Sequence, residues 1–347
     1  MIILINAGGS GTRLWPLSTK DLPKQFLSLI GNQSLLQSAY ERASKLATKD
    51  KIYISTSENC KDIVAQQIPD ISHEQIITEP CRKDTMGSVL NSAQYIASRH
   101  SNDEPIASIN SDQFIKHGDR FNEDIGLASE VSKKESRIVL LGMEPDKPGP
   151  KFGHIKKGSV FNSTRLFEVQ GFKEKPDLET AIKYFQSGEY LFNAGSFIAS
   201  YKIFKQNVAE VSPEWLSKLN QLEKAKTKED RDTIYETFEN ISMDIGLIEK
   251  VKDLLVLPQS YSWVDLGSFD DVYAVNKKDE NNNSTQSSNR VISIDSKGTY
   301  INSTGHNKPI AVVGLDHIIV IDTPEGLLIA GMDHAQEVKK ISDILEA

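Results

Sequence analysis

The chain begins with a short apolar run that leads directly into a glycine-rich segment. Residues Ile2 to Asn6 are followed by Ala7-Gly8-Gly9, and Gly11 comes two residues later. A short apolar run bounded by glycines predicts a buried strand that feeds a tight loop. Glycines in such a loop let backbone N–H groups approach phosphate oxygens without clashes from a Cβ atom. The opening of the chain therefore predicts a strand-end loop suited to phosphate.

Strand-like and helix-like segments alternate after this loop. Strands are expected at 51–56, 74–80, 105–112 and 137–142, and helices at 34–47, 58–67, 84–99, 178–187 and over most of 201–239. This alternation is typical of a parallel sheet with crossover helices. Ligands of such sheets bind at the carboxyl ends of the strands, where both the glycine-rich loop and Asp112 are expected to lie.

The composition and the pattern of the sequence change in its second half. Residues 145–158 are dense in Pro, Gly and Lys and are expected to form a loop, whereas 277–289 contain no apolar residue and predict a linker. Short β-rich runs separated by turn residues follow the linker, and an amphipathic helix is expected at 335–345. We therefore expect two domains, a catalytic domain at 1–277 and a β-rich domain at 286–347.

The bulk properties restrict the functional class. The 347 residues carry a net charge of −8, which argues against a general nucleic-acid-binding protein. The two cysteines, Cys60 and Cys81, are too few for a disulfide framework, and their usage fits a reducing compartment. No apolar run approaches the ~20 residues needed to cross a bilayer, so no membrane association is expected. The expected location is the cytoplasm.

Two basic residues lie close to the glycine-rich loop in the sequence. Arg13 and Lys24 add positive charge there, and an arginine can bind a phosphate through two parallel hydrogen bonds. The segment is not a Walker loop, because no Gly-Lys-Ser/Thr follows. It also differs from a dinucleotide-binding fingerprint, because Leu14 stands where the last glycine should be.

A series of motifs in a fixed order extends over nearly the whole chain. They are GGSGTRLWPLS (8–18), PKQF (23–26), TEP (78–80), SD (111–112), FGHI (152–155), FKEKPD (172–177), NAGSF (193–197), SMDIGLIEK (242–250) and WVDLGS (263–268). In these motifs the sequence closely resembles bacterial mannose-1-phosphate guanylyltransferases, which are sugar nucleotidyltransferases. Residues 312–341 resemble the C-terminal module of that family.

The resemblance implies both a fold and a reaction. The implied fold is α/β, a Rossmann-like and mostly parallel sheet flanked by helices, with a small left-handed β-helix-like C-terminal domain and no fused isomerase domain. The implied reaction joins GTP and mannose 1-phosphate into GDP-mannose and pyrophosphate. Because two polyanions must meet, catalysis of this kind depends mainly on positioning and charge neutralisation. The apolar C-terminal module also suggests a homodimer contact.

The resemblance further implies which residues act. Asp112 and Asp265 would bind Mg²⁺, which prefers carboxylate oxygens together with phosphates and water. Arg13 and Lys24 would hold the triphosphate and stabilise the departing pyrophosphate. The nucleotide-binding positions would be Ala7, Gly8, Gly9, Gly11, Thr12, Arg13, Glu79, Pro80, Thr85 and Ser111. The sugar-phosphate-binding positions would be Gly153, Glu174, Lys175, Asn193 and Gly195.

The sequence departs from the family at several of these places. Asp84 stands where the family has an asparagine, so the identity of the nucleotide base stays open. Gln113 replaces the histidine that usually follows the metal-binding aspartate, and His154 replaces an aromatic residue expected near the sugar. Asp244 matches a polar family position without an assigned role. Alternatives are therefore another hexose or heptose 1-phosphate, another base, or a catalytically silent regulatory subunit that binds a nucleotide sugar.

Overall fold

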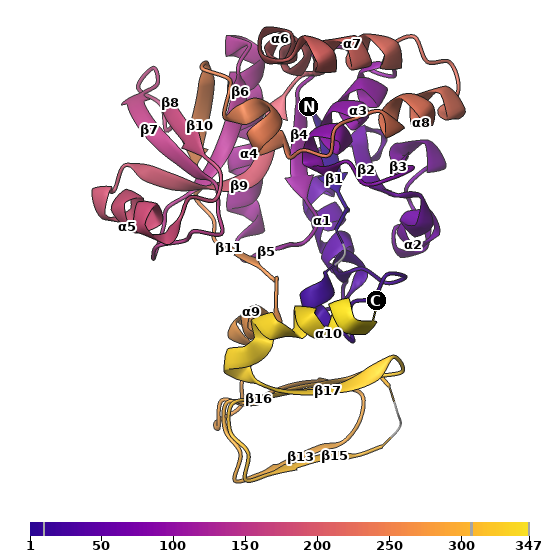
Figure 1. Ribbon diagram of the computed structural model, residues 1–347, viewed down its shortest axis with the longest axis vertical. Coiled ribbons are helices and arrows are strands. Elements are labelled where there is room, and N and C mark those ends of the chain that lie inside the picture. The colour runs from indigo at the N-terminus through magenta and orange to yellow at the C-terminus, as the bar shows by residue number, and fades with distance from the viewer. Residues whose placement is uncertain (10, 306–307, 346–347) are drawn as a thin grey trace. The chain divides into compact units, whose positions relative to one another are not determined.

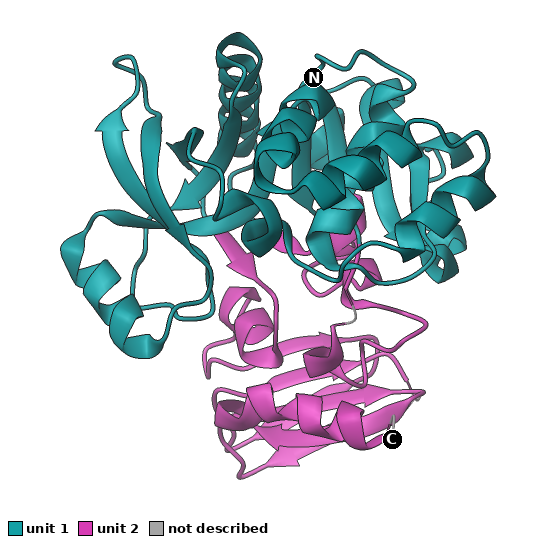
Figure 2. Cartoon of the chain, turned by 45° about the horizontal axis from the view of Figure 1, so that its top comes forward, with its two compact units in different colours: residues 1–7, 39–111, 115–262 teal, residues 8–38, 112–114, 263–347 magenta. Residues whose placement is uncertain are grey.

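The computed structural model of the chain describes residues 1–9, 11–305 and 308–345 (Figure 1). The contacts between residues divide the chain into two compact units (Figure 2). Unit 1 consists of Met1–Ala7, Ala39–Ser111 and Ile115–Ser262, and unit 2 of Gly8–Ser38, Asp112–Phe114 and Trp263–Ala347. The glycine-rich segment therefore belongs to the same unit as the C-terminal part of the chain. The predicted domains, 1–277 and 286–347, stay a prediction.

Unit 1 is built on one large mixed sheet. In the described part of the chain it has nine strands, in the order β3-β2-β1-β4-β9-β6-β10-β8-β7. The strands are β1 Ile2–Asn6, β2 Ile52–Ser57, β3 Ile76–Glu79, β4 Ile106–Asn110, β6 Ile138–Met143, β7 His154–Val160, β8 Phe167–Lys173, β9 Tyr190–Ala199 and β10 Leu254–Pro258. Strands β3, β2, β1 and β4 run parallel, β9 is antiparallel to both of its main neighbours, and β6 and β10 are parallel.

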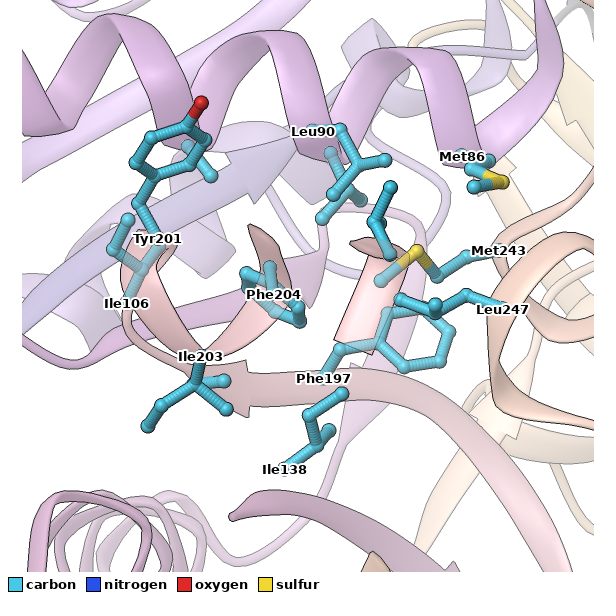
Figure 3. Packing of buried hydrophobic residues seen from close by; sticks show 14 of the residues in the cluster. Met86, Leu90, Ile106, Ile138, Phe197, Tyr201, Ile203, Phe204, Met243 and Leu247 are labelled. Carbon is cyan, nitrogen blue, oxygen red and sulfur yellow. The ribbon is translucent and has the colours of Figure 1, made fainter. Parts of the chain in front are cut away.

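Helices connect and cover this sheet. They are α1 Leu35–Ser44, which begins in unit 2, α2 Lys61–Gln67, α3 Asp84–Ala97, α4 Gly118–Glu135, α5 Leu178–Ser187, α6 Tyr201–Val211, α7 Pro213–Leu222 and α8 Lys228–Glu236. Short 3-10 turns lie at η3 Lys49–Lys51, η4 Glu58–Cys60 and η5 His73–Gln75, and a π-helical turn, η6, at Asp244–Ile248. In the core, Leu90 of α3, Phe197 of β9 and Phe204 of α6 pack together (Figure 3). These three side chains are at most 2% exposed.

Capping residues divide the helical stretch that the sequence predicts over 201–239. Ser200 caps α6, and its hydroxyl accepts a hydrogen bond from the backbone N–H of Ile203. Ser212 caps α7 with Pro213 at its start, and Thr227 caps α8 in a reciprocal capping box with Asp230. Such residues satisfy the free N–H groups of a first helical turn, so each of them begins a new helix.

Unit 2 combines the glycine-rich segment with a coil of short strands. Strand β5 Gln113–Ile115, whose last residue belongs to unit 1, pairs with β11 Trp263–Asp265. The remaining elements are η1 Thr12–Leu14, η2 Lys24–Phe26, α9 Phe269–Val275, β12 Ser284–Ser287, β13 Val291–Ile294, β14 Tyr300–Ser303, β15 Ile310–Val313, β16 Ile318–Thr323, β17 Gly326–Gly331, η7 Met332–Glu337 and α10 Val338–Leu345. Strands β12, β14 and β16 stack in parallel, as do β13 and β15, in the manner of a β-helix.

A hydrophobic core joins the N-terminal and C-terminal segments of unit 2. Leu14 and Leu17 from the N-terminal segment cluster with Phe269, Tyr300 and Ile319 from the C-terminal segments. All five are at most 9% exposed. The first turn after the glycine-rich loop is therefore packed against the β-helical coil.

The predicted fold class is confirmed, and two local predictions are wrong. Residues Ser284–Ser287, inside the predicted linker at 277–289, form strand β12, which pairs in register with β14. The strand is polar because backbone pairing and side-chain hydrogen bonds, such as that from Gln286 to the Ser28 carbonyl, stabilise it in place of apolar packing. The predicted loop at 145–158 is wrong from His154 onward, where β7 begins and pairs with β8 and β9.

None of the helices in the described ranges has the length and apolarity that crossing a bilayer would require.

Candidate active site

The glycine-rich loop depends on backbone conformations that favour glycine. Gly9 and Gly11 have φ angles of 105° and 61°, in the left-handed region. A Cβ atom on Gly11 would lie 2.6 Å from Cβ of Lys24 and 2.7 Å from Oγ of Ser18. Gly11 is therefore required twice, for its φ angle and for the close approach of Lys24.

Lys24 joins two carboxylates within unit 2. Its Nζ lies 3.0 Å from Oδ2 of Asp112 and 3.3 Å from Oδ1 of Asp265. Asp112 directly precedes β5 and Asp265 ends β11, so the pairing of these two strands brings the carboxylates together. Lys24 itself follows Pro23 at the start of η2 and is only 9% exposed.

The charges of this cluster decide the protonation of Lys24. Burial alone would lower its pKa, but the neighbouring carboxylates of Asp112 and Asp265 outweigh burial and raise the pKa above its ordinary value. The ammonium is therefore kept charged. A charged lysine at this place can meet a polyanionic ligand once a cation takes over its two carboxylate partners.

Arg13 lies beside the same cluster. Its Nη1 donates a hydrogen bond to Oε1 of Gln336 at 3.1 Å. A Cβ atom on Gly267 would lie 3.2 Å from Nη2 of Arg13 and 3.3 Å from Oδ2 of Asp265. Because Gly267 has no side chain, the guanidinium and this carboxylate can both approach its backbone. Sequence reasoning did not single out Gly267, although it lies in the WVDLGS motif.

The donor set of the cluster fits a magnesium ion that is shared with phosphate. The two aspartates offer hard oxygen ligands, and no group of three or more His, Cys, Asp or Glu side chains in the described part of the chain could hold a metal. Mg²⁺ at nucleotide sites commonly uses one or two carboxylates and takes its other ligands from phosphate and water. The assignment of Asp112 and Asp265 to Mg²⁺ stays a prediction.

A second group of predicted residues comes together in unit 1. The backbone N–H of Asn193 donates to the carbonyl of Gly153 at 2.8 Å, and Oδ1 of Asn193 accepts the N–H of Gly195 at 3.2 Å. A Cβ atom on Gly153 would lie 2.6 Å from Oε2 of Glu174. The Glu174 carboxylate also pairs with Nζ of Lys175 at 3.1 Å. All five predicted sugar-phosphate positions thus lie in one neighbourhood.

Asp244 completes this second group. It is the first residue of the π-helical turn η6, and its Oδ1 accepts a hydrogen bond from Nδ2 of Asn193 at 2.6 Å. Burial, followed by the negative charge of Glu174, raises the pKa of Asp244 to about 7. π-helical turns are frequent at functional sites. The sequence left the role of Asp244 open, and the structure places it against a predicted sugar-pocket residue.

Two asparagines at neighbouring strand ends were missed as site candidates. Asn110, at the end of β4, donates from Nδ2 to the carbonyl of Gly195 at 3.2 Å. Asn6, at the end of β1, donates to Oγ of Ser108 at 2.8 Å. Gly195 has a φ angle of 66°, and a Cβ atom on it would lie 2.9 Å from Nδ2 of Asn110. Amide side chains at the carboxyl ends of adjacent strands were the available signal.

Glu79 is held by the fold of unit 1. Its Oε1 accepts hydrogen bonds from the hydroxyls of Ser55 and Ser88, and its Oε2 accepts one from Tyr235 at 2.7 Å. Three donors occupy most of the acceptor capacity of one carboxylate. A contact of Glu79 with the base stays a prediction, and it has to use the remaining lone pairs.

The remaining nucleotide predictions are divided between the units. Gly8, Gly9, Gly11, Thr12 and Arg13 lie in unit 2 with Lys24, Asp112 and Asp265, whereas Ala7, Glu79, Pro80, Thr85 and Ser111 lie in unit 1. In unit 1, Ser111 donates its N–H and its hydroxyl to the Asn6 carbonyl, and Thr85 Oγ1 accepts the N–H of Met243 at 2.8 Å.

The departures from the family motifs also have definite places. Asp84 has a φ angle of 56° at the start of α3, and its Oδ1 accepts the N–H of Thr85 at 2.6 Å. Gln113 is buried in β5. His154 is 1% exposed and packs against Phe192 and Tyr184, and burial lowers its pKa. His154 is thus a neutral packing residue, and it is its neighbour Gly153 that faces Asn193 and Glu174.

Comparisons with known proteins agree on one class. Residues 2–282 match the family described as Nucleotidyl transferase, and residues 289–345 match the MannoseP isomerase/GMP-like beta-helix domain. The Xanthan biosynthesis protein XanB of Xanthomonas campestris pv. campestris is 31% identical over 97% of this chain and 72% of its own length. A mannose-1-phosphate guanylyltransferase of Klebsiella pneumoniae is 30% identical over 100% of this chain and 74% of its own length.

A solved structure covers the whole fold. The crystal structure described as mannose-1-phosphate geranyltransferase from Thermus thermophilus is 25% identical, with a TM-score of 0.89, and the similarity covers 100% of this chain and 99% of that chain. The similarity includes the β-helical coil as well as the large sheet.

Proposed function

Because the chain belongs to the nucleotidyl transferase family, we propose that this enzyme transfers a guanylyl group from GTP to α-D-mannose 1-phosphate, with GDP-mannose and pyrophosphate as products. In this reaction an oxygen of the sugar phosphate attacks the α-phosphorus of GTP. The new P–O bond forms as the bond between the α-phosphorus and the bridging oxygen breaks, and pyrophosphate leaves. The compartment that we propose for the reaction is the cytoplasm, where both substrates are metabolites.

The observation that carries the proposal is the charged cluster of unit 2. Lys24 contacts both Asp112 and Asp265, and Arg13 lies next to Asp265 at Gly267. Two cationic side chains beside a glycine-rich loop can offset the charge of a triphosphate and of the leaving pyrophosphate. At Gly11 and Gly267 the absence of a side chain lets Lys24 and Arg13 approach the loop backbone closely.

Asp112 and Asp265 would hold the magnesium ion. The bound ion would neutralise phosphate charge and make the α-phosphorus more susceptible to attack. Lys24 pairs with both carboxylates in the structure, and it would turn to the phosphates when the nucleotide binds. Arg13 would bind the β- and γ-phosphates through its fork of N–H groups.

The sugar assignment rests on the second group of residues and on the relatives. Asn193 offers an amide that can donate to one hydroxyl and accept from another, Glu174 offers a hydroxyl acceptor, and Lys175 offers a charge for the phosphate. The relative from Klebsiella pneumoniae is named for mannose 1-phosphate and for guanylyl transfer. Another hexose or a heptose 1-phosphate, or another base, is the alternative that the departure at Asp84 keeps open.

The test is a substrate panel with purified protein and Mg²⁺. Each nucleoside triphosphate is combined with each of several sugar 1-phosphates, and pyrophosphate release is measured. We expect GTP with mannose 1-phosphate to give the highest kcat/KM, by about tenfold or more over the next pair. Release of pyrophosphate only with another sugar or base would reject this substrate pair and keep the reaction class. Nucleotide-sugar binding without turnover of any pair would reject catalysis.

A further inference from the structure

A chain of hydrogen bonds connects the phosphate-loop arginine with the C-terminal segment of unit 2. Nη1 of Arg13 donates to Oε1 of Gln336 at 3.1 Å, and Nε2 of Gln336 donates to Oγ of Ser268 at 2.6 Å. The Ser268 hydroxyl in turn contacts Oδ2 of Asp271 at 2.9 Å and the carboxylate of Asp270. These residues lie up to 323 positions apart in the sequence.

The direction of the hydrogen bonds fixes the role of Gln336. A guanidinium only donates, so the Gln336 amide has to present its oxygen to Arg13. The Ser268 hydroxyl gives its proton to a carboxylate, so it accepts from the Gln336 nitrogen. An amide, which both accepts and donates, satisfies both neighbours at once, and its oxygen is the part that holds Arg13.

The segment that carries Gln336 is fixed to the core of unit 2. Gln336 lies in η7, and its neighbours Ala335 and Val338, which are 1% and 2% exposed, belong to that core. Ser268, at the other end of the amide, is completely buried. Gln336 is thus held by its backbone, which is packed into the core, and by the hydrogen bond from its amide to Ser268. A side chain that is already held in place lowers the entropy cost of fixing the guanidinium.

The same arrangement places Arg13 beside a predicted metal ligand. The guanidinium and the Asp265 carboxylate flank the space that a side chain on Gly267 would fill. Gln336 is the side chain that accepts a hydrogen bond from Arg13 within the ranges that the structure describes. Without it, the long arginine side chain would sample several rotamers, and part of the binding free energy would be spent on ordering it.

We propose that Gln336 is a positioning residue, which holds the Arg13 guanidinium in the place where the pyrophosphate part of the nucleotide binds. The inference rests on the proposed function, since it assigns Arg13 to these phosphates. It extends that function by making η7, in the C-terminal part of the chain, a component of the phosphate site. Gln336 itself needs no contact with the substrate.

The test compares three variants of the full-length protein. Gln336→Met keeps the length of the side chain and removes both hydrogen bonds, and Gln336→Glu keeps the acceptor for Arg13. Glu337→Ala is the matched control, because Glu337 is exposed in the same turn and forms ion pairs with His334 and Lys340. Thermal unfolding checks that all variants are folded.

The readout is the split between two Michaelis constants in the reverse reaction. For Gln336→Met we expect the KM for pyrophosphate to rise about tenfold and the KM for GDP-mannose to stay within about twofold. Gln336→Glu should recover most of this loss, and Glu337→Ala should behave as the wild type. An unchanged KM for pyrophosphate in Gln336→Met, or an equal rise in both constants, would overturn the proposal.

Calorimetric titration with magnesium pyrophosphate separates this proposal from the proposed function. We expect weaker binding in Gln336→Met, and no further weakening when Gln336→Met is added to Arg13→Gln, because Gln336 acts through Arg13. Additive losses would show that Gln336 acts by another route. If the wild type turned over no GTP with mannose 1-phosphate but this coupling were present, the proposed function would fail and the positioning role would stand.

Discussion

At the scale of single residues, Lys24 is the residue on which the candidate site depends most. It is buried between Asp112 and Asp265, and their charges raise its pKa in spite of burial. The ammonium offsets one of the two negative charges of the carboxylates. The removal of its charge should therefore affect stability and metal binding together.

Lys24→Met should abolish turnover and make the protein more sensitive to Mg²⁺. Two neighbouring carboxylates that lose their shared partner repel each other, so we expect destabilisation of about 1–3 kcal/mol, less than for a fully buried pair. Millimolar Mg²⁺ should raise the melting temperature of this variant by more than that of the wild type. Lys339→Met, on the exposed side of α10, is the control. If Mg²⁺ raised the melting temperature of both variants equally, Lys24 would not be the partner that competes with Mg²⁺ for the two carboxylates.

Asp244 should give the protein a pH-dependent stability. Its pKa is raised to about 7, above the ordinary value of 3.8, so the folded state binds an extra proton between these values. The stabilisation is then complete below about pH 4 and is lost as the pH rises through about 7. Asp244→Asn should remove this contribution, which urea unfolding at about pH 5 and about pH 8 would measure. If Asp244→Asn lost as much stability as the wild type between about pH 5 and about pH 8, the pH dependence would not come from Asp244.

The sequence predicted many residues of the site, but it did not predict the hydrogen bonds that link them to distant parts of the chain. Arg13, Lys24, Asp112 and Asp265 were named from their motifs, and they lie together in unit 2. Gln336 and Asn110 were not named, because their importance comes from contacts with residues that are far away in the sequence. A lone glutamine in a polar segment carries no local signal of a bond to an arginine near the other end of the chain.

At the scale of elements, the π-helical turn η6 requires a glycine for packing. A Cβ atom on Gly246 would overlap Sδ of Met86, which belongs to helix α3 and is completely buried. Interiors are close-packed, so the Met86 side chain, the turn or the helix must move when the residue grows. The turn also carries Asp244, and its position depends on this contact.

Gly246→Ala should therefore destabilise the protein by about 1–3 kcal/mol, the usual range for overpacking. It should also raise the KM for the sugar phosphate, because Asp244 moves with the turn. Shortening Met86 to alanine makes space, so the double variant should be more stable than the sum of the two single losses predicts. Chemical denaturation of the four proteins measures this coupling, and strict additivity would exclude the contact as the cause.

Helices and strands could be predicted where the residues that define them lie within or next to the element. Helix α5 occurs at the predicted residues, since Asp177 caps its start and Gly188, with a φ of 69°, ends it. Strand β12 was mistaken for a linker, because its polar side chains are stabilised by partners elsewhere in unit 2 and not by an apolar face. Short strands of a coil depend on their neighbours, so local composition does not reveal them.

At the scale of the whole molecule, the contact units do not follow the order of the chain. The glycine-rich segment Gly8–Ser38 shares a core with the C-terminal coil, although most residues between Ser38 and Trp263 belong to the other unit. This association had no signal in the sequence, because the leucines that the N-terminal segment contributes, Leu14, Leu17, Leu27, Leu29 and Leu35, lie far in the sequence from their C-terminal partners. The C-terminal coil is consequently a structural support of the phosphate loop.

Ile319→Ala tests this association. Ile319 is completely buried in β16, so its truncation should cost about 2–5 kcal/mol of the stability of unit 2. Hydrogen exchange should then become faster in residues 12–30 as well as in the coil, while β1 to β4 stay protected. If exchange in residues 12–30 followed the large sheet of unit 1 instead, the loop would not belong to the core of the coil.

We propose that Asp112 and Asp265 hold one divalent ion together with the phosphates of the nucleotide. The most direct measurement is a crystal structure with GDP-mannose and Mn²⁺, in which anomalous scattering locates the metal. We predict one strong peak within coordination distance of both carboxylates and of a phosphate oxygen, with Lys24 turned towards the phosphates. A peak that touches neither Asp112 nor Asp265 while the nucleotide sugar is bound would contradict this claim.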